Sequence, residues 1–282
     1  MPGTLFVVAT PIGNLEDVTA RALRVLGEVS LIAAEDTRRT AHLLARYAIT
    51  TPTTSLHEHN EEKKGPTLVE RMRRGESIAL VSDAGTPTVS DPGHRFIAAA
   101  IQAGIRVEPI PGPSAALAAL AASGLPTETF LFLGFPPVRS KDRLEWFAAV
   151  RSAARTVVFF EAPHRIRGTL EQLLAIVGDC QVAIGRELTK AHEELVRGPI
   201  SQVLHGLATT RGEFTVVADV GHMPHQNQPE PVADREMANE FGVMTNNRKM
   251  SRRQAIATIA RRYGRAPNDV YAAIERTKKL VE

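Results

Sequence analysis

The 282-residue chain contains a single cysteine, Cys180. One cysteine excludes an internal disulfide framework and any zinc site built from several cysteines, and it suits a reducing compartment. No run of 18 apolar residues occurs, so the sequence predicts no membrane-spanning helix. The first residues also lack the basic segment and apolar stretch of a secretory signal. We therefore expect a cytoplasmic protein that makes no membrane contact.

Several common ligand-binding patterns are missing as well. No G-x-G-x-x-G motif follows the first expected strand and no Gly-Lys-Ser/Thr occurs, which argues against a dinucleotide fold and against triphosphate hydrolysis. Aromatic residues make up only 5% of the chain, which argues against a sheet face that binds RNA by base stacking. His57 and His59 resemble a ligand pair but have no third partner nearby in sequence, and we predict no metal site.

Charge is distributed unevenly along the chain. Residues 246–282 hold ten Lys or Arg and three Asp or Glu, whereas residues 1–245 hold 24 and 28. The basic character of the whole protein therefore comes from its C-terminal segment. Such a cationic segment is a candidate contact for a phosphate backbone, although a solvated helical face explains the same charge.

Short apolar runs alternate with amphipathic patterns along most of the chain. The expected strands are 5–9, 29–34, 78–81, 105–110, 156–160, 181–185 and 214–219. Helices are expected between them, among them 66–74, which has Pro66 in its first turn. This alternation predicts an α/β fold with a mainly parallel sheet covered by helices on both faces.

Two interruptions divide the chain. Paired prolines within 134–140 break the alternation, and the segment from His222 to Pro231 is rich in Pro, Gln, Asn and His, which is typical of a linker. Two short amphipathic helices are expected at 251–263 and 267–278. We assign residues 1–122 to an N-terminal α/β lobe and residues 123–221 to a C-terminal α/β lobe. Residues 222–245 are assigned to a linker and residues 246–282 to a basic helical domain.

Two loops with the character of a binding site follow neighbouring expected strands. They are residues 82–87 (SDAGTP) and 111–114 (PGPS). Ligands of open α/β sheets bind beyond the carboxyl ends of strands, glycine permits close backbone approach, and a helix beginning near Ser114 attracts a carboxylate or phosphate. A turn that merely closes the chain explains either loop alone, but the two together favour a binding site.

Six ordered motifs resemble the tetrapyrrole methylase family, and in particular its ribosomal RNA branch. They are residues 3–17 (GTLFVVATPIGNLED), 34–38 (AEDTR), 56–60 (LHEHN), 81–87 (VSDAGTP), 110–115 (IPGPSA) and 186–190 (RELTK). The resemblance spans residues 3–220, and the C-terminal segment is similar to the small helical domain that ends these proteins. The loop at 10–14 is TPIGN rather than the Gly-rich loop usual in the porphyrin-methylating branch.

The resemblance implies two α/β lobes of the class III methyltransferase type, a small C-terminal helical domain and a homodimer. It implies S-adenosylmethionine as cofactor and, as substrate, a cytidine ribose 2′-hydroxyl in the decoding region of 16S ribosomal RNA in the small ribosomal subunit. Cofactor contacts of the family fall on Pro11, Ile12, Asp83, Gly85, Thr86, Ser114, Ala115, Phe160, Leu188 and Phe214. Relatives often have Tyr and Ser where this chain has Phe160 and Ala162, so roles that need those hydroxyls are not carried over.

Methylation of a ribose hydroxyl requires a group that accepts its proton. The candidates at strand ends are Asp36, Glu187 and Lys190, of which we favour Asp36, with Arg38 and Lys190 positioning the RNA. Lys190 accepts a proton only if burial lowers its pKa, and the alternative is a phosphate contact or an ion pair with Glu187 or Glu194. Because residues 1–245 are acidic, RNA needs local positive surface, for which the candidates are Arg38, Arg39, Lys63, Lys64, Arg252 and Arg253.

Two other functions remain open at this point. A methyltransferase of the same fold that acts on a tetrapyrrole would not need the cationic C-terminal segment. A non-catalytic protein that binds RNA or assists assembly would not need the loops that carry Asp83, Gly112 and Ser114.

Overall fold

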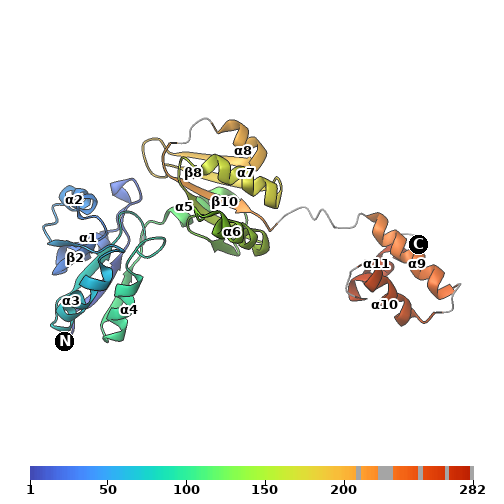
Figure 1. Cartoon of the computed structure of the whole chain (residues 1–282), viewed down its shortest axis with the longest axis horizontal. Helices are drawn as coiled ribbons and strands as arrows, with labels where there is room; N and C mark the ends of the chain where they lie inside the picture. Colours follow the sequence, from blue (N-terminus) through green and yellow to red (C-terminus); the bar gives the residue numbers. More distant parts are fainter. Residues whose placement is uncertain (208–210, 222–230, 247–249, 264–266, 280–282) are drawn as a thin grey trace. The chain divides into compact units, whose positions relative to one another are not determined.

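The computed structural model describes residues 1–207, 211–221, 231–246, 250–263 and 267–279. The chain forms two compact units, Met1–Met223 and Pro224–Glu282, which are described separately below (Figure 1). The first unit contains two five-stranded sheets, each with helices packed against it. The expected α/β fold with two lobes and a C-terminal group of helices is thus confirmed.

The first sheet is entirely parallel, with strand order β3-β2-β4-β1-β5. Its strands are β1 (Thr4–Val8), β2 (Leu31–Ala34), β3 (Thr53–Ser55), β4 (Ile78–Val81) and β5 (Arg106–Ile110). Its helices are α1 (Ala20–Glu28), α2 (Thr37–Arg46), α3 (Glu61–Arg73) and α4 (His94–Gln102), with a 3-10 turn η1 (Leu15–Asp17). Residues of α1 and α2 pack on one face and residues of α3 and α4 on the other, which explains why β2 and β4 are apolar on both faces.

The second sheet has strand order β6-β7-β10-β8-β9. Its strands are β6 (Phe130–Phe132), β7 (Thr156–Glu161), β8 (Gln181–Arg186), β9 (Glu194–Pro199) and β10 (Phe214–Asp219). Its helices are α5 (Ala115–Ser123), α6 (Ser140–Ala153), α7 (Ile166–Val177) and α8 (Ile200–Gly206). Helices α6, α7 and α8 pack on one face around Phe159 and Leu170, and α5 packs on the other.

The second sheet differs from the mainly parallel sheet that the sequence predicts. Only β6 and β7 are parallel, whereas β10 runs antiparallel to both β7 and β8, and β8 is antiparallel to β9. The segment 187–193 between β8 and β9 is too short for a helical crossover, so these strands pair antiparallel. Strands β3, β6 and β9 were not expected, because they are short or interrupted by polar residues.

Three further features differ from the expectation. Helix α3 begins at Glu61 rather than at Pro66, with two glutamates in its first turn where the helix dipole favours negative charge. Residues 115–122, assigned above to the N-terminal lobe, form α5, whose alanines allow close packing against Val158 and Val217 of the second sheet. The third difference lies in the second unit, in the stretch where we expected a linker.

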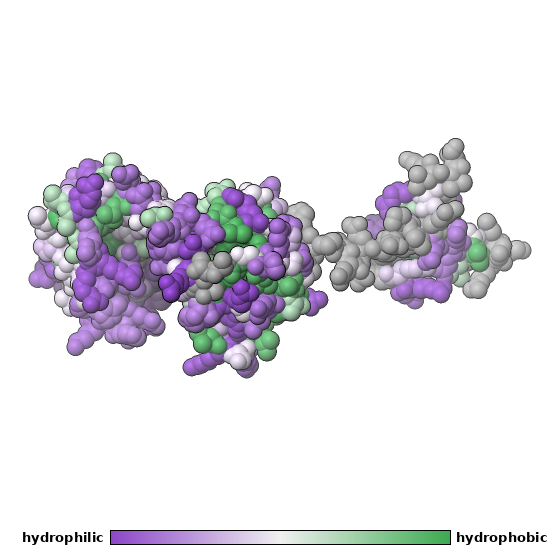
Figure 2. Space-filling view, turned by 90° about the horizontal axis from the view of Figure 1, so that it is seen from above, coloured by the Kyte–Doolittle hydropathy of each residue, from purple (hydrophilic) through white to green (hydrophobic). Residues whose placement is uncertain are grey.

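The second unit consists of α9 (Pro231–Asn246), α10 (Arg252–Tyr263) and α11 (Pro267–Lys279). Residues 231–245 are thus helical, because Met237, Phe241 and Met244 recur at helical spacing and pack with Ile259 and Val270. Residues 222–230 of the expected linker lie outside the described residues. No described helix combines the length and apolar character needed to cross a membrane. On the face drawn in Figure 2, hydrophilic residues predominate and hydrophobic residues gather in smaller patches.

Candidate active site

A cavity of about 450 Å³ lies in the first unit, within the size range of small-molecule sites. Its lining comes from the loops that follow β1, β2, β4 and β5 in the N-terminal lobe and from segments at β7, β8 and β10 in the C-terminal lobe. The structure brings nine of the ten expected cofactor residues to this cavity: Ile12, Asp83, Gly85, Thr86, Ser114, Ala115, Phe160, Leu188 and Phe214. Pro11 adjoins Ile12 in the chain but does not line the cavity.

The loops after β1 and β4 are joined by a pair of backbone hydrogen bonds. The Thr10 amide donates to the Gly85 carbonyl and the Gly85 amide donates to the Thr10 carbonyl, each at 2.9 Å. Gly85 has a φ of +76°, which favours glycine, and a Cβ there would stand 3.4 Å from the Ile12 Cγ2 atom. A larger residue at 85 would therefore strain the backbone at the cavity wall.

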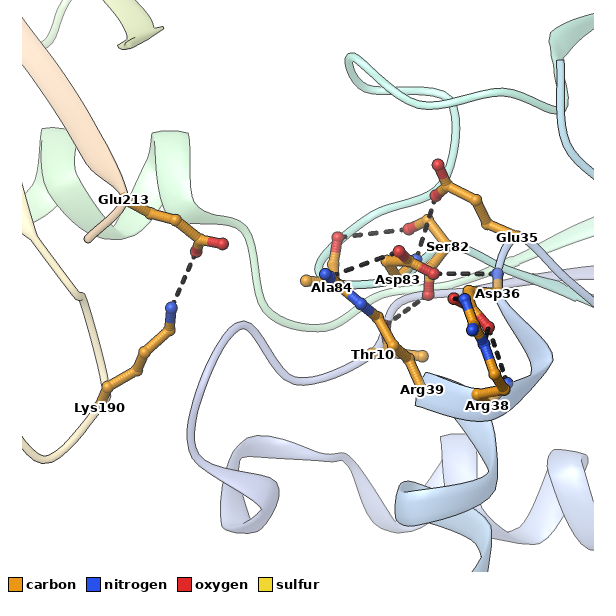
Figure 3. Close-up of polar contacts among 10 residues, drawn as sticks. All are labelled: Thr10, Glu35, Asp36, Arg38, Arg39, Ser82, Asp83, Ala84, Lys190 and Glu213. Carbon is orange, nitrogen blue, oxygen red and sulfur yellow. Dashed lines mark hydrogen bonds and ion pairs between the residues drawn. The ribbon is translucent and has the colours of Figure 1, made fainter. Parts of the chain in front are cut away.

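Asp83 is held in place by its neighbours at the ends of the parallel strands. Its Oδ1 accepts a hydrogen bond from the Asp36 amide at 3.0 Å, and its Oδ2 lies 3.4 Å from Arg39 Nη1. The Asp83 amide donates to Glu35 Oε2 at 3.2 Å (Figure 3). These contacts link the loops after β2 and β4 and fix the Asp83 carboxylate at the cavity wall.

The start of α5 supplies the next part of the wall. Ser114 is the N-cap residue of α5, yet its side chain forms no capping hydrogen bond. The Thr86 hydroxyl, by contrast, donates to the Pro113 carbonyl at 3.3 Å. Ser114 therefore has a hydroxyl that remains free to bond a ligand in the cavity, whereas Thr86 supports the loop.

The C-terminal lobe contributes mainly apolar side chains. Phe160, Leu188 and Phe214 line the cavity together with Phe135, whose ring centroid lies 5.4 Å from that of Phe160. An apolar and aromatic wall of this kind suits a flat heterocyclic group such as adenine.

A buried ion-pair network lies behind this apolar wall. The Glu161 side chain has no exposed surface and pairs with Arg165 Nε at 3.2 Å and, more loosely, with Arg143 Nη1 at 3.9 Å. The hydroxyl of Thr169 and the amide of Ala162 also donate to its carboxylate. Arg165 donates in turn to the carbonyl of Pro136, so the network ties the loop after β7 to the segment that carries Phe135.

Two cavity carboxylates, Glu35 and Asp91, were not expected from the sequence. The pKa of Asp91 is raised to about 6, mainly by burial; the negative charges of Glu35 and Asp83 add to the rise, and the Ser82 hydroxyl opposes it. Burial also raises the pKa of Glu35, against a hydrogen bond from the Asp83 amide. The missed signal was a second aspartate in the loop after β4, where Asp-Pro-Gly is typical of a turn.

Asp36, the proton acceptor favoured above, does not line the cavity. It is the N-cap of α2, where its carboxylate accepts from the Arg38 amide at 2.9 Å and binds the Arg38 guanidinium at 2.7 Å (Figure 3). The hydrogen bonds from the Arg38 side chain and amide lower the pKa of Asp36 to about 2. A carboxylate held this way is a weak base and has a structural role, so the arrangement does not favour Asp36 as proton acceptor.

Lys190 and Glu187 pair with each other at 3.0 Å, as one alternative above expects. Lys190 also pairs with Glu213 at 3.0 Å (Figure 3), whereas Glu194 pairs with Arg186. Burial lowers the pKa of Lys190, but its hydrogen bonds to Glu187 and Glu213 raise it more, so the amine stays charged. A charged amine cannot accept a proton, which leaves Lys190 a positioning role.

The loop that carries Lys190 is strained and closely packed. Glu187 and Thr189 have φ values of +50° and +66°, which are uncommon for residues other than glycine. The Thr189 hydroxyl accepts a hydrogen bond from the Asn14 amide at 3.0 Å. A Cβ at Gly13 would stand 2.5 Å from the Lys190 Cγ atom, so only glycine fits between the two loops.

The expected RNA-binding residues are placed differently from one another. The side chains of Arg38 and Arg39 are 88% and 66% exposed, although each pairs with an aspartate. Lys63 is exposed, whereas the Lys64 amine is used within the chain, where it donates to the Ser55 carbonyl and hydroxyl at 2.8 and 2.9 Å. Arg252 and Arg253 are exposed on α10 and form no ion pair with another described residue.

Among the described residues, no group of three His, Cys, Asp or Glu side chains is arranged to hold a metal ion.

Comparisons with known proteins agree with this architecture. The model of the family Tetrapyrrole (Corrin/Porphyrin) Methylases matches residues 4–204. Proteins named Ribosomal RNA small subunit methyltransferase I are similar over most of their length. The one from Halalkalibacterium halodurans is 50% identical over 77% of this chain and 76% of its own, and the one from Haemophilus influenzae is 39% identical over 96% of both. The one from Escherichia coli O157:H7 is 42% identical over 84% of both chains.

Solved structures show the same fold at low sequence identity. A uroporphyrin-III-C-methyltransferase from Thermus thermophilus superimposes with a TM-score of 0.54 at 23% identity, covering 81% of this chain and all of its own. A diphthine synthase superimposes with a TM-score of 0.61 at 18% identity, covering 77% of this chain and 90% of its own.

Proposed function

The chain belongs to the tetrapyrrole methylase family, and we propose that it is a methyltransferase that uses S-adenosylmethionine to methylate 16S ribosomal RNA. The proposed target is the ribose 2′-hydroxyl of a cytidine in the decoding region. The observation that carries this proposal is the similarity to proteins named ribosomal RNA small subunit methyltransferase I, which reaches 96% of the chain at 39% identity. The cytoplasm is the proposed location, and a homodimer the proposed assembly.

The cavity suits S-adenosylmethionine in volume and in the character of its lining. Phe160, Leu188 and Phe214 supply an apolar wall for adenine, and Ser114 offers a free hydroxyl. Glu35 is a carboxylate without an ion pair among the described residues, which suits a ligand that carries positive charge. When bound, this cofactor supplies a methyl group on a positively charged sulfur.

The chain's own residues have to align the hydroxyl with that methyl group and accept its proton. Orientation within bonding distance contributes much of the rate in a reaction of this type. Lys190 follows β8, and Arg38 and Arg39 follow β2, in segments close to the cavity lining, and we assign them to holding RNA phosphates. Glu187 keeps Lys190 in place through their 3.0 Å contact.

The second unit is proposed to add affinity for the ribosomal RNA through Arg252 and Arg253. Each phosphate contact contributes about 0.7–0.9 to the slope of log affinity against log salt. The double variant Arg252→Ala, Arg253→Ala should therefore lower that slope by about 1.5, with cofactor affinity unchanged. Arg24→Ala, which removes an exposed arginine paired with Glu28, is the control. An unchanged slope in the double variant would show that these residues do not contact RNA.

Transfer of labelled methyl groups tests the proposed function directly. We expect transfer to small ribosomal subunits from cells that lack the gene, at a cytidine ribose that is unmodified there. A uroporphyrinogen should not be methylated under the same conditions. The reverse result would favour the tetrapyrrole alternative, for which the low-identity structural neighbours supply only the shared fold.

A further inference from the structure

Asp91 lies in the loop between β4 and α4, which crosses the cavity wall. Val89, Ser90 and Asp91 all line the cavity. Thr88 and Ser90 have φ values of +71° and +68°, and such left-handed conformations cost about 1–3 kcal/mol in non-glycine residues. Strain of this kind persists where the surrounding structure enforces it, and it is common at functional sites.

The surroundings hold this loop in its strained conformation. A Cβ at Gly93 would stand 2.8 Å from the Leu80 Cδ2 atom in the core, so the end of the loop packs tightly on β4. On its other side, a Cβ at Gly134 would stand 3.2 Å from the Ser90 Oγ atom. The loop is therefore packed between the first sheet and the segment that carries Phe135, and Asp91 is presented to the cavity from a fixed backbone.

The other carboxylates that line the cavity are already bound to groups of the chain. Glu161 is paired with two arginines and Glu213 with Lys190, and Asp83 is paired with Arg39. Glu35 accepts a hydrogen bond from the Asp83 amide. Asp91 forms no ion pair with any described residue, and the nearby Ser82 hydroxyl donates to the Ala84 carbonyl at 3.3 Å.

We propose that Asp91 accepts the proton of the attacking ribose hydroxyl. The hydroxyl oxygen forms the new C–O bond as the C–S bond of the methyl donor breaks and leaves its electron pair on sulfur. The O–H proton passes to a carboxylate oxygen of Asp91, and water later removes it. The products are a methyl ether, a neutral thioether and a proton, so atoms and charge balance. This inference rests on the proposed function, because it names the base for that reaction.

The charges around Asp91 suit this role. The pKa of Asp91 is raised to about 6, mainly by burial, with contributions from Glu35 and Asp83. Of the basic groups in the elements around it, Arg39 pairs with Asp83, and His94 is the first residue of α4, three residues after Asp91. A base is most effective when its pKa lies near the working pH, because it is then both deprotonated and a strong enough acceptor. Asp36, with a pKa of about 2, is a far weaker acceptor.

The test compares wild type with Asp91→Asn, Asp91→Glu and the control Asp142→Asn, which changes an exposed aspartate on α6. Single-turnover methyl transfer is measured from pH 5 to pH 8 with saturating donor and RNA. The wild-type rate should rise through about pH 6 and then level off. Asp91→Asn should lower the rate by about 10²–10⁴ and abolish this inflection, whereas Asp91→Glu should retain it.

Two further measurements do not depend on turnover. Infrared difference spectra of the free enzyme should show a carboxyl group that titrates near pH 6 in wild type and Asp142→Asn and is missing in Asp91→Asn. Calorimetry should give equal affinities of wild type and Asp91→Asn for the methyl donor. If Asp91→Asn instead weakens the positively charged donor but not its neutral thioether product, Asp91 binds the cation and the proposal is wrong.

The failure of this proposal can be told apart from failure of the proposed function. An active wild-type enzyme whose Asp91→Asn variant keeps its rate and pH profile overturns only the role of Asp91. A wild-type enzyme that transfers no methyl group to ribosomal RNA overturns the function, and the role of Asp91 with it. Circular dichroism of each variant shows whether a lost rate reflects a lost fold. If Asp91→Asn does not fold, Asp91→Glu still tests the proposal, which is refuted if that variant is fully active but lacks the pH inflection.

Discussion

The N-terminal lobe reaches the cavity through loops that follow parallel strands, whereas the C-terminal lobe reaches it from a mostly antiparallel sheet. The two lobes also differ in how their charges are used. Glu35 and Asp91 of the N-terminal lobe have no ion pair among the described residues. In the C-terminal lobe Glu161 is paired with Arg165, and Lys190 lies between two glutamates.

This difference indicates a division of labour between the lobes. Parallel strands end together at one edge of a sheet, so their loops bring several polar groups to one place. The C-terminal lobe instead presents Phe160, Leu188 and Phe214, with its buried charges neutralised behind them. We infer that the first lobe supplies groups that react with or bind charge, and that the second supplies a fixed apolar wall.

The largest effect is expected where the C-terminal lobe depends on its buried charge. Glu161→Ala should lower the free energy of unfolding by about 3–5 kcal/mol, because it leaves Arg165 and Arg143 without their buried partner. Glu28→Ala removes an exposed partner of Arg24 and should cost less than about 0.5 kcal/mol. Urea denaturation measures both. Equal, small losses would mean that the network does not support the wall.

A smaller effect is expected at Asp83, which holds the loops of the N-terminal lobe together. Asp83→Ala removes the acceptor of the Asp36 amide and the partner of Arg39. It should weaken binding of S-adenosylmethionine by about 1–3 kcal/mol, the range for one lost charge-assisted hydrogen bond. Calorimetry of the folded variant, with Asp142→Asn as control, measures this loss. Unchanged affinity would remove Asp83 from the proposed cofactor site.

The sequence was a good guide to strands and loops and a poorer guide to pairing. Apolar runs such as Ile78–Val81 predict buried strands because both of their faces are covered. They do not encode the direction of the neighbouring strand, so β10 could be predicted as a strand but its antiparallel pairing could not. The edge strand Glu194–Pro199 has two charged residues and ends in Gly-Pro, so it carries little hydrophobic pattern.

The candidate site shows the same limit. The motifs that resemble the family identify the residues around the cavity, because these motifs follow strands whose ends meet there. The partner of each charge does not follow from the motif. Asp36 resembles a catalytic carboxylate in sequence, yet it caps α2 and binds Arg38. Asp91 resembles a turn residue, yet it is partly buried in the cavity wall.

The last prediction compares one carboxylate from each lobe. We expect Asp91 to destabilise the fold at neutral pH, whereas Glu161 stabilises it. The folded state raises the pKa of Asp91 from its ordinary value of 3.8 to about 6. Below pH 3.8 the group is neutral in the folded and unfolded states, and its contribution to stability is fully retained. That contribution is lost as the pH rises through 6, because the folded state then holds a buried charge.

Asp91→Asn should therefore stabilise the protein at pH 7.5 and have little effect at pH 4. A shift of about two pKa units corresponds to about 3 kcal/mol for a fully shielded group. Asp91 is only partly buried, so solvent screening reduces the expected gain to about 1 kcal/mol. Urea denaturation of wild type and variant at both pH values measures the gain. A variant that is destabilised equally at pH 4 and pH 7.5 would mean that Asp91 supports the fold in the way Glu161 does, and the contrast between the lobes would not hold.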